Sequence, residues 1–389
     1  MREQVNFREI VLEHHKLYSA MEVQDYIKLA YQATFGGGHL VTDARESFRR
    51  LQEEAAEAGK CGLKCSCENY DHGDADSWNS QGEEFTDDGT IAGQTDPFEY
   101  VGDNHSRLHL DRLNGRISLE TVNCMFLDSA SELTGTEEEF KEKMETVRQC
   151  CADKLLDISL EEFEKQYEDY LKQGIHAVHH SRSFNEKYHP AYRIVKNCYH
   201  HYFQAFEQIE QLLKESDQPV LKVAIDGRCA GGKSTLGNLL KNTYDCNLFH
   251  MDDFFLQPYQ RTPERRAQAG GNVDYERFKT EVLDQIDAQK QTFDYQLYSC
   301  KHQQLTDFVS VEKKRLNIVE GSYSQHPYFG DCYDLRFFVD VSPELQLERI
   351  EKRNGKEMLE NFKTMWIPME EKYFSAYDVR SKSTVLISC

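Results

Sequence analysis

Short apolar runs alternate with longer stretches of helical spacing in the C-terminal half of the chain. The apolar runs are the strand candidates Val220–Asp226, Cys246–Met251, Leu316–Glu320, Leu335–Val341 and Thr384–Ser388. Strands that alternate with helices in this way are typical of a parallel sheet with helices on both faces. The pattern therefore predicts an α/β domain over residues 215–389.

The N-terminal half has the helical period instead. Apolar side chains form a mostly helical stripe along Phe7–Tyr31, and helical spacing returns at Glu137–Cys151 and at Ser159–Gln173. Ser159 is a typical N-cap residue, and the acidic residues that follow it suit the first turn of a helix. We expect residues 1–190 to form a mainly helical domain.

Two segments interrupt this organisation. From about residue 61 to residue 96 the chain is rich in Asp, Glu, Gly and Ser and has few aliphatic side chains, which predicts an acidic insertion that cannot fold alone. After His189 and Pro190, residues Ala191–Leu213 have the apolar spacing of one long helix. The sequence therefore predicts a connecting helix over residues 191–214.

Composition and charge narrow the class of protein. The 389 residues have a formal net charge of −21, which disfavours nucleic acid and anionic membrane as partners, because phosphate binding needs a broad basic surface. No stretch approaches the roughly 20 apolar residues of a membrane span, and Met1–Glu13 lacks the apolar core of a secretion signal. We expect a cytoplasmic protein whose twelve cysteines are mainly reduced thiols. Cys61, Cys65 and Cys67 match no common zinc spacing.

The most specific motif follows the first strand candidate of the C-terminal half. Residues 227–235 fit the pattern G-x-x-x-x-G-K-[ST], and a helical pattern follows them. Glycines let backbone N–H groups approach phosphates, and the N-terminus of the next helix favours the same anion. In this pattern Lys233 reaches the β and γ phosphates, and the Ser234 hydroxyl holds Mg²⁺. The predicted nucleotide-binding residues are Gly227, Arg228, Cys229, Ala230, Gly231, Gly232, Lys233, Ser234 and Thr235.

Carboxylates stand at the ends of two further strand candidates. Asp252 and Asp253 follow one strand, and Glu320 ends another, at the edge where open α/β sheets bind ligands. A carboxylate there can accept the proton of an attacking hydroxyl or hold Mg²⁺. Adjacent side chains point in different directions, so we favour Asp252 over Asp253, both as the catalytic base and as a residue of the Mg²⁺ site. Strand-end acids that cap a turn are the alternative interpretation.

Two arginines follow the strand candidate Leu335–Val341. Ser342 and Pro343 are typical of a helix start, and Arg349 and Arg353 lie four residues apart on one face of that helix. Such a pair is suited to clamping phosphate charge as a lid closes. A solvated helix surface with salt bridges would have the same pattern.

Together these features resemble a known family. Residues from about Pro219 to Cys389 resemble the uridine kinase and phosphoribulokinase group of P-loop kinases, which includes nicotinamide riboside kinases. The resemblance rests on the phosphate-binding motif, on Asp252–Phe255, on Asn272–Asp274 with Phe278, on Glu320 and Gly321, and on the two arginines. It implies a P-loop parallel sheet flanked by helices, and transfer of the γ-phosphoryl group of ATP to a primary alcohol, often the 5′-hydroxyl of a nucleoside.

The resemblance also implies roles for single residues. It gives Asp252 the position of the base, Asp274 that of an acid that binds ribose hydroxyls, and Tyr298 that of an aromatic residue near the base. Ser234 and Glu320 match the positions that hold Mg²⁺. Tyr275 and Glu276 follow Asp274, where uridine kinases have histidine and proline. That departure bears on the nucleobase more than on phosphoryl transfer.

The sequence therefore predicts an ATP-dependent, uridine kinase-like enzyme that uses Mg²⁺ and phosphorylates a small hydroxyl-bearing metabolite, with a nucleoside as the first candidate. A GTPase is disfavoured because no Asn-Lys-x-Asp run follows the motif, and a transporter ATPase because no Leu-Ser-Gly-Gly-Gln-like run is present. A nucleotide-gated sensor, whose N-terminal domain binds a ligand or a partner, stays open. Scattered histidines between His39 and His189 could form a metal site or serve as core and surface residues.

Overall fold

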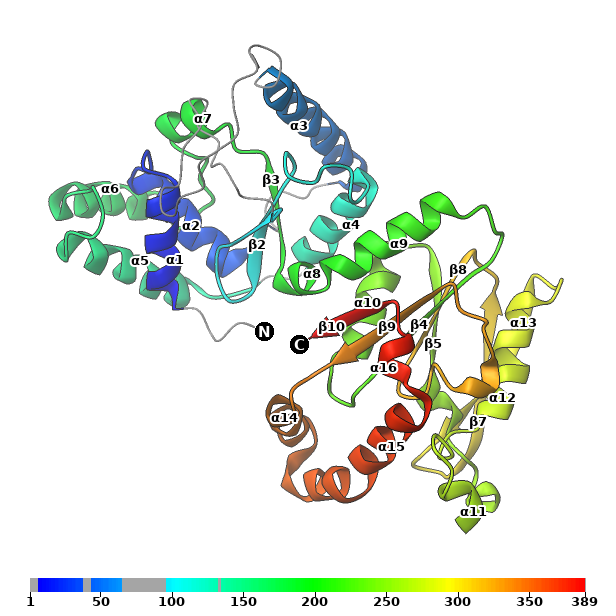
Figure 1. Cartoon of the computed structure of the whole chain (residues 1–389). Coiled ribbons are helices and arrows are strands. Elements are labelled where there is room, and N and C mark those ends of the chain that lie inside the picture. Colours follow the sequence, from blue (N-terminus) through cyan, green and yellow to red (C-terminus); the bar gives the residue numbers. More distant parts are fainter. Residues whose placement is uncertain (1–5, 38–42, 65–95, 132–133, 389) are drawn as a thin grey trace, which may run out of the picture. The chain divides into compact units, whose positions relative to one another are not determined.

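The computed structural model describes residues 6–37, 43–64, 96–131 and 134–388, with the backbone alone at 59–64. The chain divides into two compact units, Met1–His201 and Tyr202–Cys389. Each unit is shown in Figure 1. Most of the predicted acidic insertion and the side chains of its cysteine cluster lie outside the described residues, although residues 61–64 end a helix.

Helices dominate the N-terminal unit, as the sequence predicts. They are α1 (Phe7–Leu17), α2 (Val23–Phe35), α3 (Ala44–Lys64), α4 (Leu119–Ala130), α5 (Glu137–Ala152), α6 (Leu160–Lys172), α7 (Arg182–Tyr188) and α8 (Asn197–His201). Side chains of α1, α2, α5 and α6 pack into one core, which contains Val11, Tyr26, Phe140 and Phe163. The hydroxyl of Ser159 accepts a hydrogen bond from the backbone N–H of Glu162, so this residue caps α6 as expected.

A three-stranded antiparallel sheet completes this unit. Its strands are β1 (Phe98–Tyr100), β2 (His105–His109) and β3 (Tyr192–Lys196), in the order β1-β2-β3. The prediction of one long helix over 191–214 is wrong at its start, because β3 pairs with β2 along its whole length. Ile194 and Val195 are β-branched and favour this pairing over a helix. The helical pattern is realised further on, in α8 and in α9 (Phe203–Glu215).

The C-terminal unit contains a parallel sheet of five strands, as predicted. The strands are β4 (Leu221–Gly227), β5 (Cys246–His250), β8 (Leu316–Glu320), β9 (Leu335–Asp340) and β10 (Val385–Ser388), in the order β10-β9-β4-β8-β5. Every pair in this sheet is parallel. Helices cover the sheet (Figure 1), and the fold is of the α/β class.

The remaining elements of this unit surround the sheet. They are α10 (Lys233–Thr243), α11 (Pro263–Arg266), α12 (Tyr275–Phe278), α13 (Asp284–Asp287), the antiparallel hairpin of β6 (Thr292–Ser299) and β7 (Gln304–Glu312), α14 (Pro343–Asn361), α15 (Ile367–Tyr377) and α16 (Val379–Lys382). None of the described helices combines the length and the apolar composition that a membrane span requires.

Strand register brings the functional candidates to one edge of the sheet. Glu320 at the end of β8 lies beside Ile225 of β4 on one side and beside His250 of β5 on the other. The residues that follow β4 and β5 therefore leave the sheet next to Glu320. This edge is the carboxyl edge, where parallel α/β sheets bind their ligands.

Candidate functional site

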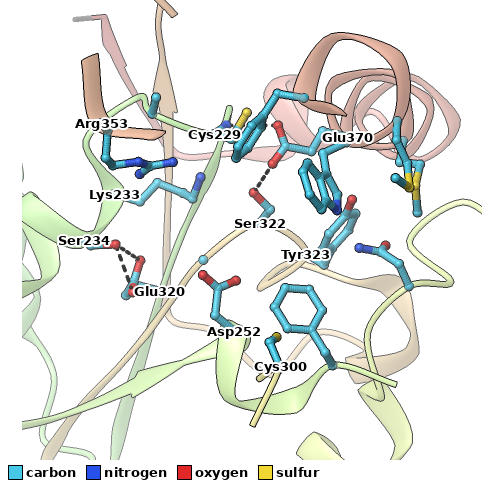
Figure 2. A pocket seen from close by; sticks show the side chains of 18 of the residues that line it. Cys229, Lys233, Ser234, Asp252, Cys300, Glu320, Ser322, Tyr323, Arg353 and Glu370 are labelled. Atoms are coloured by element: carbon cyan, nitrogen blue, oxygen red, sulfur yellow. Dashed lines mark hydrogen bonds between the residues drawn. The ribbon is translucent and has the colours of Figure 1, made fainter. Parts of the chain in front are cut away.

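A cavity of about 1060 Å³ opens at the carboxyl edge of the parallel sheet. Figure 2 shows that side chains from the β4–α10 loop, from the end of β8 and from α15 meet around it. Eight residues were predicted to act through their side chains, and six of them line the cavity: Lys233, Ser234, Asp252, Glu320, Arg349 and Arg353. The two that do not are Asp274 and Tyr298.

The phosphate loop, residues 227–235, joins β4 directly to α10. Gly227 has φ 135° and fits so closely against β9 that a Cβ atom there would lie 2.0 Å from the carbonyl oxygen of Val339. Gly232, with φ 110°, precedes the first residue of α10. Only glycine adopts such backbone angles at low energy. The glycines of the motif are therefore required by the backbone itself.

Within this loop, six of the nine predicted residues line the cavity: Cys229, Ala230, Gly232, Lys233, Ser234 and Thr235. Lys233 is 8% exposed, and its ammonium group donates hydrogen bonds to the carbonyl oxygens of Gly227 (2.8 Å) and Arg228 (2.9 Å). The Arg228 side chain turns elsewhere and pairs with Asp340 and Glu371. Lys233 is thus held at the centre of the loop by the backbone that surrounds it.

Ser234 and Glu320 form a pair of oxygen ligands beside this lysine. The Ser234 hydroxyl lies 3.2 and 3.1 Å from the two carboxylate oxygens of Glu320, to which it donates (Figure 2). His250 Nδ1 lies 2.5 Å from the same carboxylate, and this hydrogen bond raises the pKa of His250. A hydroxyl and a carboxylate are hard oxygen donors, which fit Mg²⁺ with the remaining positions left to water and phosphate.

The side chains of Asp252 and Asp253 point in different directions, as expected of adjacent residues. Both follow β5 in a short 3-10 turn, Met251–Phe254, but Asp252 lines the cavity and Asp253 does not. Asp252 is exposed to the cavity, yet the protein around it removes much of the solvent, and this desolvation raises the pKa of its carboxyl group. The nearby charge of Lys233 opposes that rise, whereas Glu320 and Glu370 add to it.

The predicted arginine pair lies on α14 and reaches the cavity. Arg349 donates a hydrogen bond of 3.2 Å to the carbonyl oxygen of Ala230 in the phosphate loop. Arg353 also lines the cavity and bonds to the side chain of Asn354 (2.8 Å). Both guanidinium groups therefore add their positive charge to that of Lys233 in the cavity wall.

Asp274 and Tyr298 have other contacts. The buried carboxylate of Asp274 caps α12 by accepting from the Arg277 backbone N–H (3.1 Å), and it also accepts from Gln260 (2.8 Å). The hydroxyl of Tyr298 accepts a hydrogen bond of 2.5 Å from Arg261. Neither side chain lines the cavity, because the N-cap hydrogen bond turns Asp274 toward its own helix and Tyr298 packs against Arg261.

Two carboxylates that carry no predicted role contribute to the site. Asp226, the penultimate residue of β4, accepts hydrogen bonds from the backbone N–H groups of Gly227, Tyr323 and Gln325 and from the Tyr373 hydroxyl. Its complete burial raises its pKa to about 6. Asp226 directly precedes Gly227, the first residue of the phosphate-binding motif. This position could have identified Asp226 as a candidate from the sequence alone. Asp226 ties the loop after β8 to the start of the phosphate loop.

The second carboxylate is Glu370 of α15, which no motif in the sequence identifies. It is 5% exposed and lines the cavity. Its carboxylate accepts from the backbone N–H of Cys229 (2.9 Å) and from the hydroxyl of Ser322 (2.5 Å), as Figure 2 shows for the serine. A carboxylate of the protein itself thus accepts a hydrogen bond from a backbone N–H group of the phosphate loop.

We expect Glu370→Gln to tighten the binding of a nucleoside triphosphate by about tenfold, equivalent to about 1.4 kcal/mol. Glutamine keeps the size of the side chain but removes a negative charge that repels phosphate groups. Titration calorimetry with a non-hydrolysable ATP analogue measures the change. Glu360→Gln is the matched control, since Glu360 pairs with Lys363 and does not line the cavity. Weaker binding by Glu370→Gln would show that the carboxylate supports the loop rather than opposing the ligand.

The N-terminal unit has a separate buried network of charged and polar groups. The Glu99 carboxylate of β1 lies 2.8 Å from Arg107 Nη1, 2.8 Å from His14 Nε2 and 3.1 Å from His109 Nε2, and it accepts a hydrogen bond from Tyr18. Burial alone would raise the pKa of Glu99, but Arg107 and His14 bring it well below its ordinary value. This carboxylate is therefore ionised within the core.

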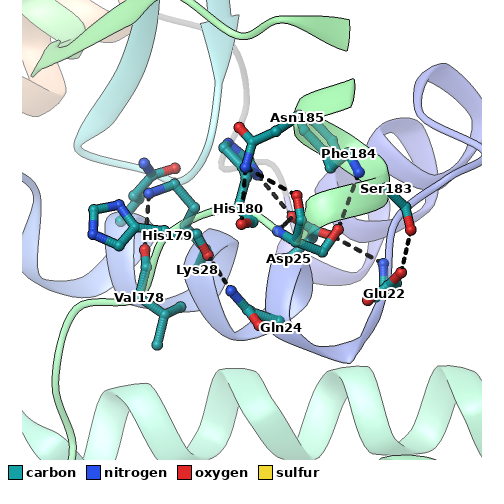
Figure 3. Close-up of polar contacts among 12 residues, drawn as sticks. Glu22, Gln24, Asp25, Lys28, Val178, His179, His180, Ser183, Phe184 and Asn185 are labelled. Atoms are coloured by element: carbon teal, nitrogen blue, oxygen red, sulfur yellow. Dashed lines mark hydrogen bonds and ion pairs between the residues drawn. The ribbon is translucent and has the colours of Figure 1, made fainter. Parts of the chain in front are cut away.

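The network continues toward the start of α2, which Figure 3 shows. Arg107 donates to Gln32, Gln32 donates to Tyr192, and the Tyr192 hydroxyl lies 2.6 Å from His180 Nε2. His180 Nδ1 lies 2.8 Å from the Asp25 carboxylate. Burial lowers the pKa of His180 to about 4, against the opposing effect of Asp25. A neutral histidine thus links the Asp25 carboxylate, through Tyr192 and Gln32, to the ion pair of Arg107 and Glu99.

This arrangement bears on the scattered histidines. His105, His109 and His180 are buried core residues. Among the residues that the structure describes, no group of three or more His, Cys, Asp or Glu side chains has the geometry of a metal site. His39 lies outside the described residues. His105, His109 and His180 therefore belong to the core of this unit.

Comparison with known proteins gives limited structural similarity. No family model and no curated protein sequence matches the chain. A solved structure described as a possible uridine kinase from Bacillus stearothermophilus matches with 18% sequence identity and a TM-score of 0.36, over 46% of this chain and 95% of the other. A crystal structure of a protein from Thermus thermophilus matches with 12% identity and a TM-score of 0.24, over 44% and 90% of the two chains. The sheet order and the phosphate loop by themselves show that the C-terminal unit is a P-loop parallel sheet flanked by helices.

Proposed function

We propose that the C-terminal unit transfers the γ-phosphoryl group of ATP to a hydroxyl group of a small metabolite. The observation that carries this proposal is one cavity lined by Lys233 of the phosphate loop, by the Ser234 and Glu320 pair and by Asp252. A cavity of about 1060 Å³ has room for a nucleotide and a small acceptor. Asp252, a carboxylate with a raised pKa that faces the cavity beside the phosphate loop, is a candidate for a catalytic role.

In this proposal, different residues have different roles in phosphoryl transfer. Lys233 and the backbone N–H groups of the phosphate loop bind and orient phosphate oxygens, and Arg349 and Arg353 offset the negative charge that spreads over the transferring group. Ser234 and Glu320 would hold Mg²⁺, which supplies charge neutralisation when it is bound with a nucleotide. Positioning and charge neutralisation account for most of the catalysis in this reaction class.

Asp252 is the proposed base. Its carboxylate faces the cavity, where an acceptor hydroxyl could donate its proton to it as the oxygen attacks phosphorus. The raised pKa makes the carboxylate a stronger proton acceptor than an ordinary aspartate at neutral pH. Asp274 and Tyr298 have no part in this proposal because their side chains lie outside the cavity lining.

The proposal is tested with purified protein, Mg-ATP and a panel of nucleosides, sugars, sugar acids, sugar phosphates and polyols. We expect ADP release above the acceptor-free background with at least one compound, together with a phosphorylated product detected by mass spectrometry. Lys233→Ala is expected to lose that activity, so activity that survives this substitution comes from a contaminating kinase. Absence of Lys233-dependent turnover across the panel would contradict the proposed function and favour a nucleotide-gated sensor.

A further inference from the structure

The part of the cavity lined by Arg261, Arg266 and Asn272, which we call the acceptor half, carries its own positive charge. Arg261 and Arg266 line the cavity from the segment between the Met251–Phe254 turn and α12. The cations of the nucleotide half, Lys233, Arg349 and Arg353, come from α10 and α14 instead. Phosphate loops and lid arginines meet the charge of the nucleotide. Arg261 and Arg266 belong to a different segment of the chain from these cations.

Arg261 is held in a fixed orientation. Its Nε donates to the carbonyl oxygen of Leu256 (3.0 Å), and its Nη2 donates to the hydroxyl of Tyr298 (2.5 Å). A guanidinium group has five N–H donors, so donors on the Nη1 side stay available to a ligand. The contact with Tyr298 gives that predicted residue a function: it orients an arginine.

Arg266 differs from the arginine beside it. Arg265 is fully engaged, with both terminal nitrogens at 2.6 Å from the Glu276 carboxylate and further bonds to Tyr275 and to backbone carbonyls. By contrast, the Arg266 side chain forms no hydrogen bond and no ion pair with any residue that the structure describes, and it is exposed in the cavity wall. Arg265 fixes the segment, which leaves Arg266 able to bind a ligand.

An unpaired acceptor lies in the same wall. Asn272 lines the cavity, and its Oδ1 atom is buried without a hydrogen-bond partner among the described residues. A buried polar atom without a partner is unfavourable by about 1–3 kcal/mol. A ligand hydroxyl that donates to this oxygen would remove that penalty. The acceptor half therefore offers two guanidinium groups and one hydrogen-bond acceptor.

We infer that the phosphate acceptor is a small hydroxyl compound that also carries an anionic group, either a phosphate monoester or a carboxylate. This inference rests on the proposed function. Arg261 and Arg266 bind the anionic group through charge-assisted hydrogen bonds, and Asn272 accepts from a second hydroxyl. The reacting hydroxyl then lies toward Asp252. A neutral nucleoside would leave both guanidinium groups without a partner of opposite charge, and Asp274, the acid expected to bind ribose, caps α12 instead.

The test compares acceptors that differ only in the anionic group. The two sets are glycerol, glycerate and glycerol 3-phosphate, and ribose, ribonate and ribose 5-phosphate, with uridine as the neutral nucleoside. We expect kcat/KM for at least one anionic member to exceed that of its neutral partner at least tenfold, and the preferred arm identifies the group as phosphate or carboxylate. If turnover depends on Lys233 but kcat/KM for the neutral compounds equals or exceeds that for the anionic ones, the inference is overturned and the proposed function stays intact.

Variants of the two arginines give the second readout. Arg261→Gln and Arg266→Gln are each expected to raise KM for the anionic acceptor about tenfold or more, with KM for ATP unchanged, and Arg266→Lys is expected to restore part of the loss. Lys301→Gln is the control, because Lys301 is exposed and does not line the cavity. A rise in KM for ATP with an unchanged KM for the acceptor would overturn the inference by assigning the arginines to the nucleotide. Absence of turnover with every compound would contradict the proposed function and this inference together.

Discussion

Asp252→Asn is expected to lower kcat for phosphoryl transfer by about 10²–10⁴-fold, the usual contribution of a general base. Asparagine keeps the shape of the side chain but cannot accept the proton of the acceptor hydroxyl. Asp253→Asn is the matched control, because Asp253 is adjacent, its pKa is also raised by burial, and its side chain does not line the cavity. We expect this second variant to retain nearly all of the activity.

The pH dependence of the rate provides a second measurement. The base acts only when it is ionised, so kcat/KM is expected to fall as the pH drops through the pKa of Asp252. Since desolvation raises that pKa, the fall begins at higher pH than for an ordinary aspartate. In Asp252→Asn this acid limb should disappear. Equal losses in Asp252→Asn and Asp253→Asn, or an unchanged acid limb, would contradict the assignment of Asp252 as the base.

Glu99→Gln is expected to lower the free energy of unfolding of the N-terminal unit by about 3–5 kcal/mol, the usual effect of breaking a buried ion pair. The substitution leaves the guanidinium of Arg107, which is 1% exposed, without its charged partner. It also replaces one of the two carboxylate oxygens, which lie against His14, His109 and Tyr18, with an NH2 group that cannot accept a hydrogen bond. Urea denaturation followed by circular dichroism measures the loss, and hydrogen exchange of β2 amides assigns it to this unit.

A surface ion pair supplies the control for Glu99. Arg148 and Glu164 are 2.9 Å apart and both are largely solvated, so Glu164→Gln should change the stability by about 0–1 kcal/mol. The pH dependence has a definite sign: the folded pKa of Glu99 is depressed, so its stabilisation is present above the ordinary glutamate pKa and is lost as the pH falls toward the folded value. A loss in Glu99→Gln no larger than in the control would contradict a stabilising role for the network.

Much of the C-terminal fold could be predicted because its signals are local. Strands of a parallel sheet are covered on both faces and therefore appear as continuous apolar runs, such as Leu316–Glu320, all five of whose residues are buried. The phosphate loop depends on glycines at fixed spacing, which the sequence states directly. Asp252 could be preferred over Asp253 because adjacent residues after a strand diverge.

The rest depended on tertiary contacts that the sequence does not show. Tyr192–Lys196 has the apolar spacing of a helix, and its pairing with β2 decides in favour of a strand. Asp274 lies at a familiar position along the chain, but the local hydrogen bond of an N-cap turns it away from the cavity. Glu370 lies in a helix whose orientation the sequence does not specify. In each case the position of the side chain depends on a contact that the spacing of residues along the sequence does not identify.

The close fit of Gly227 against β9 has a consequence for how inactive variants are interpreted. A side chain at this position would collide with the carbonyl of Val339, which also accepts the hydrogen bond that Arg228 donates to β9. Any replacement there disturbs the pairing of two central strands as well as the shape of the phosphate loop. Loss of activity at Gly227 would therefore report on folding and on catalysis at once, whereas a substitution of Lys233 changes a side chain and leaves the pairing of the two strands in place.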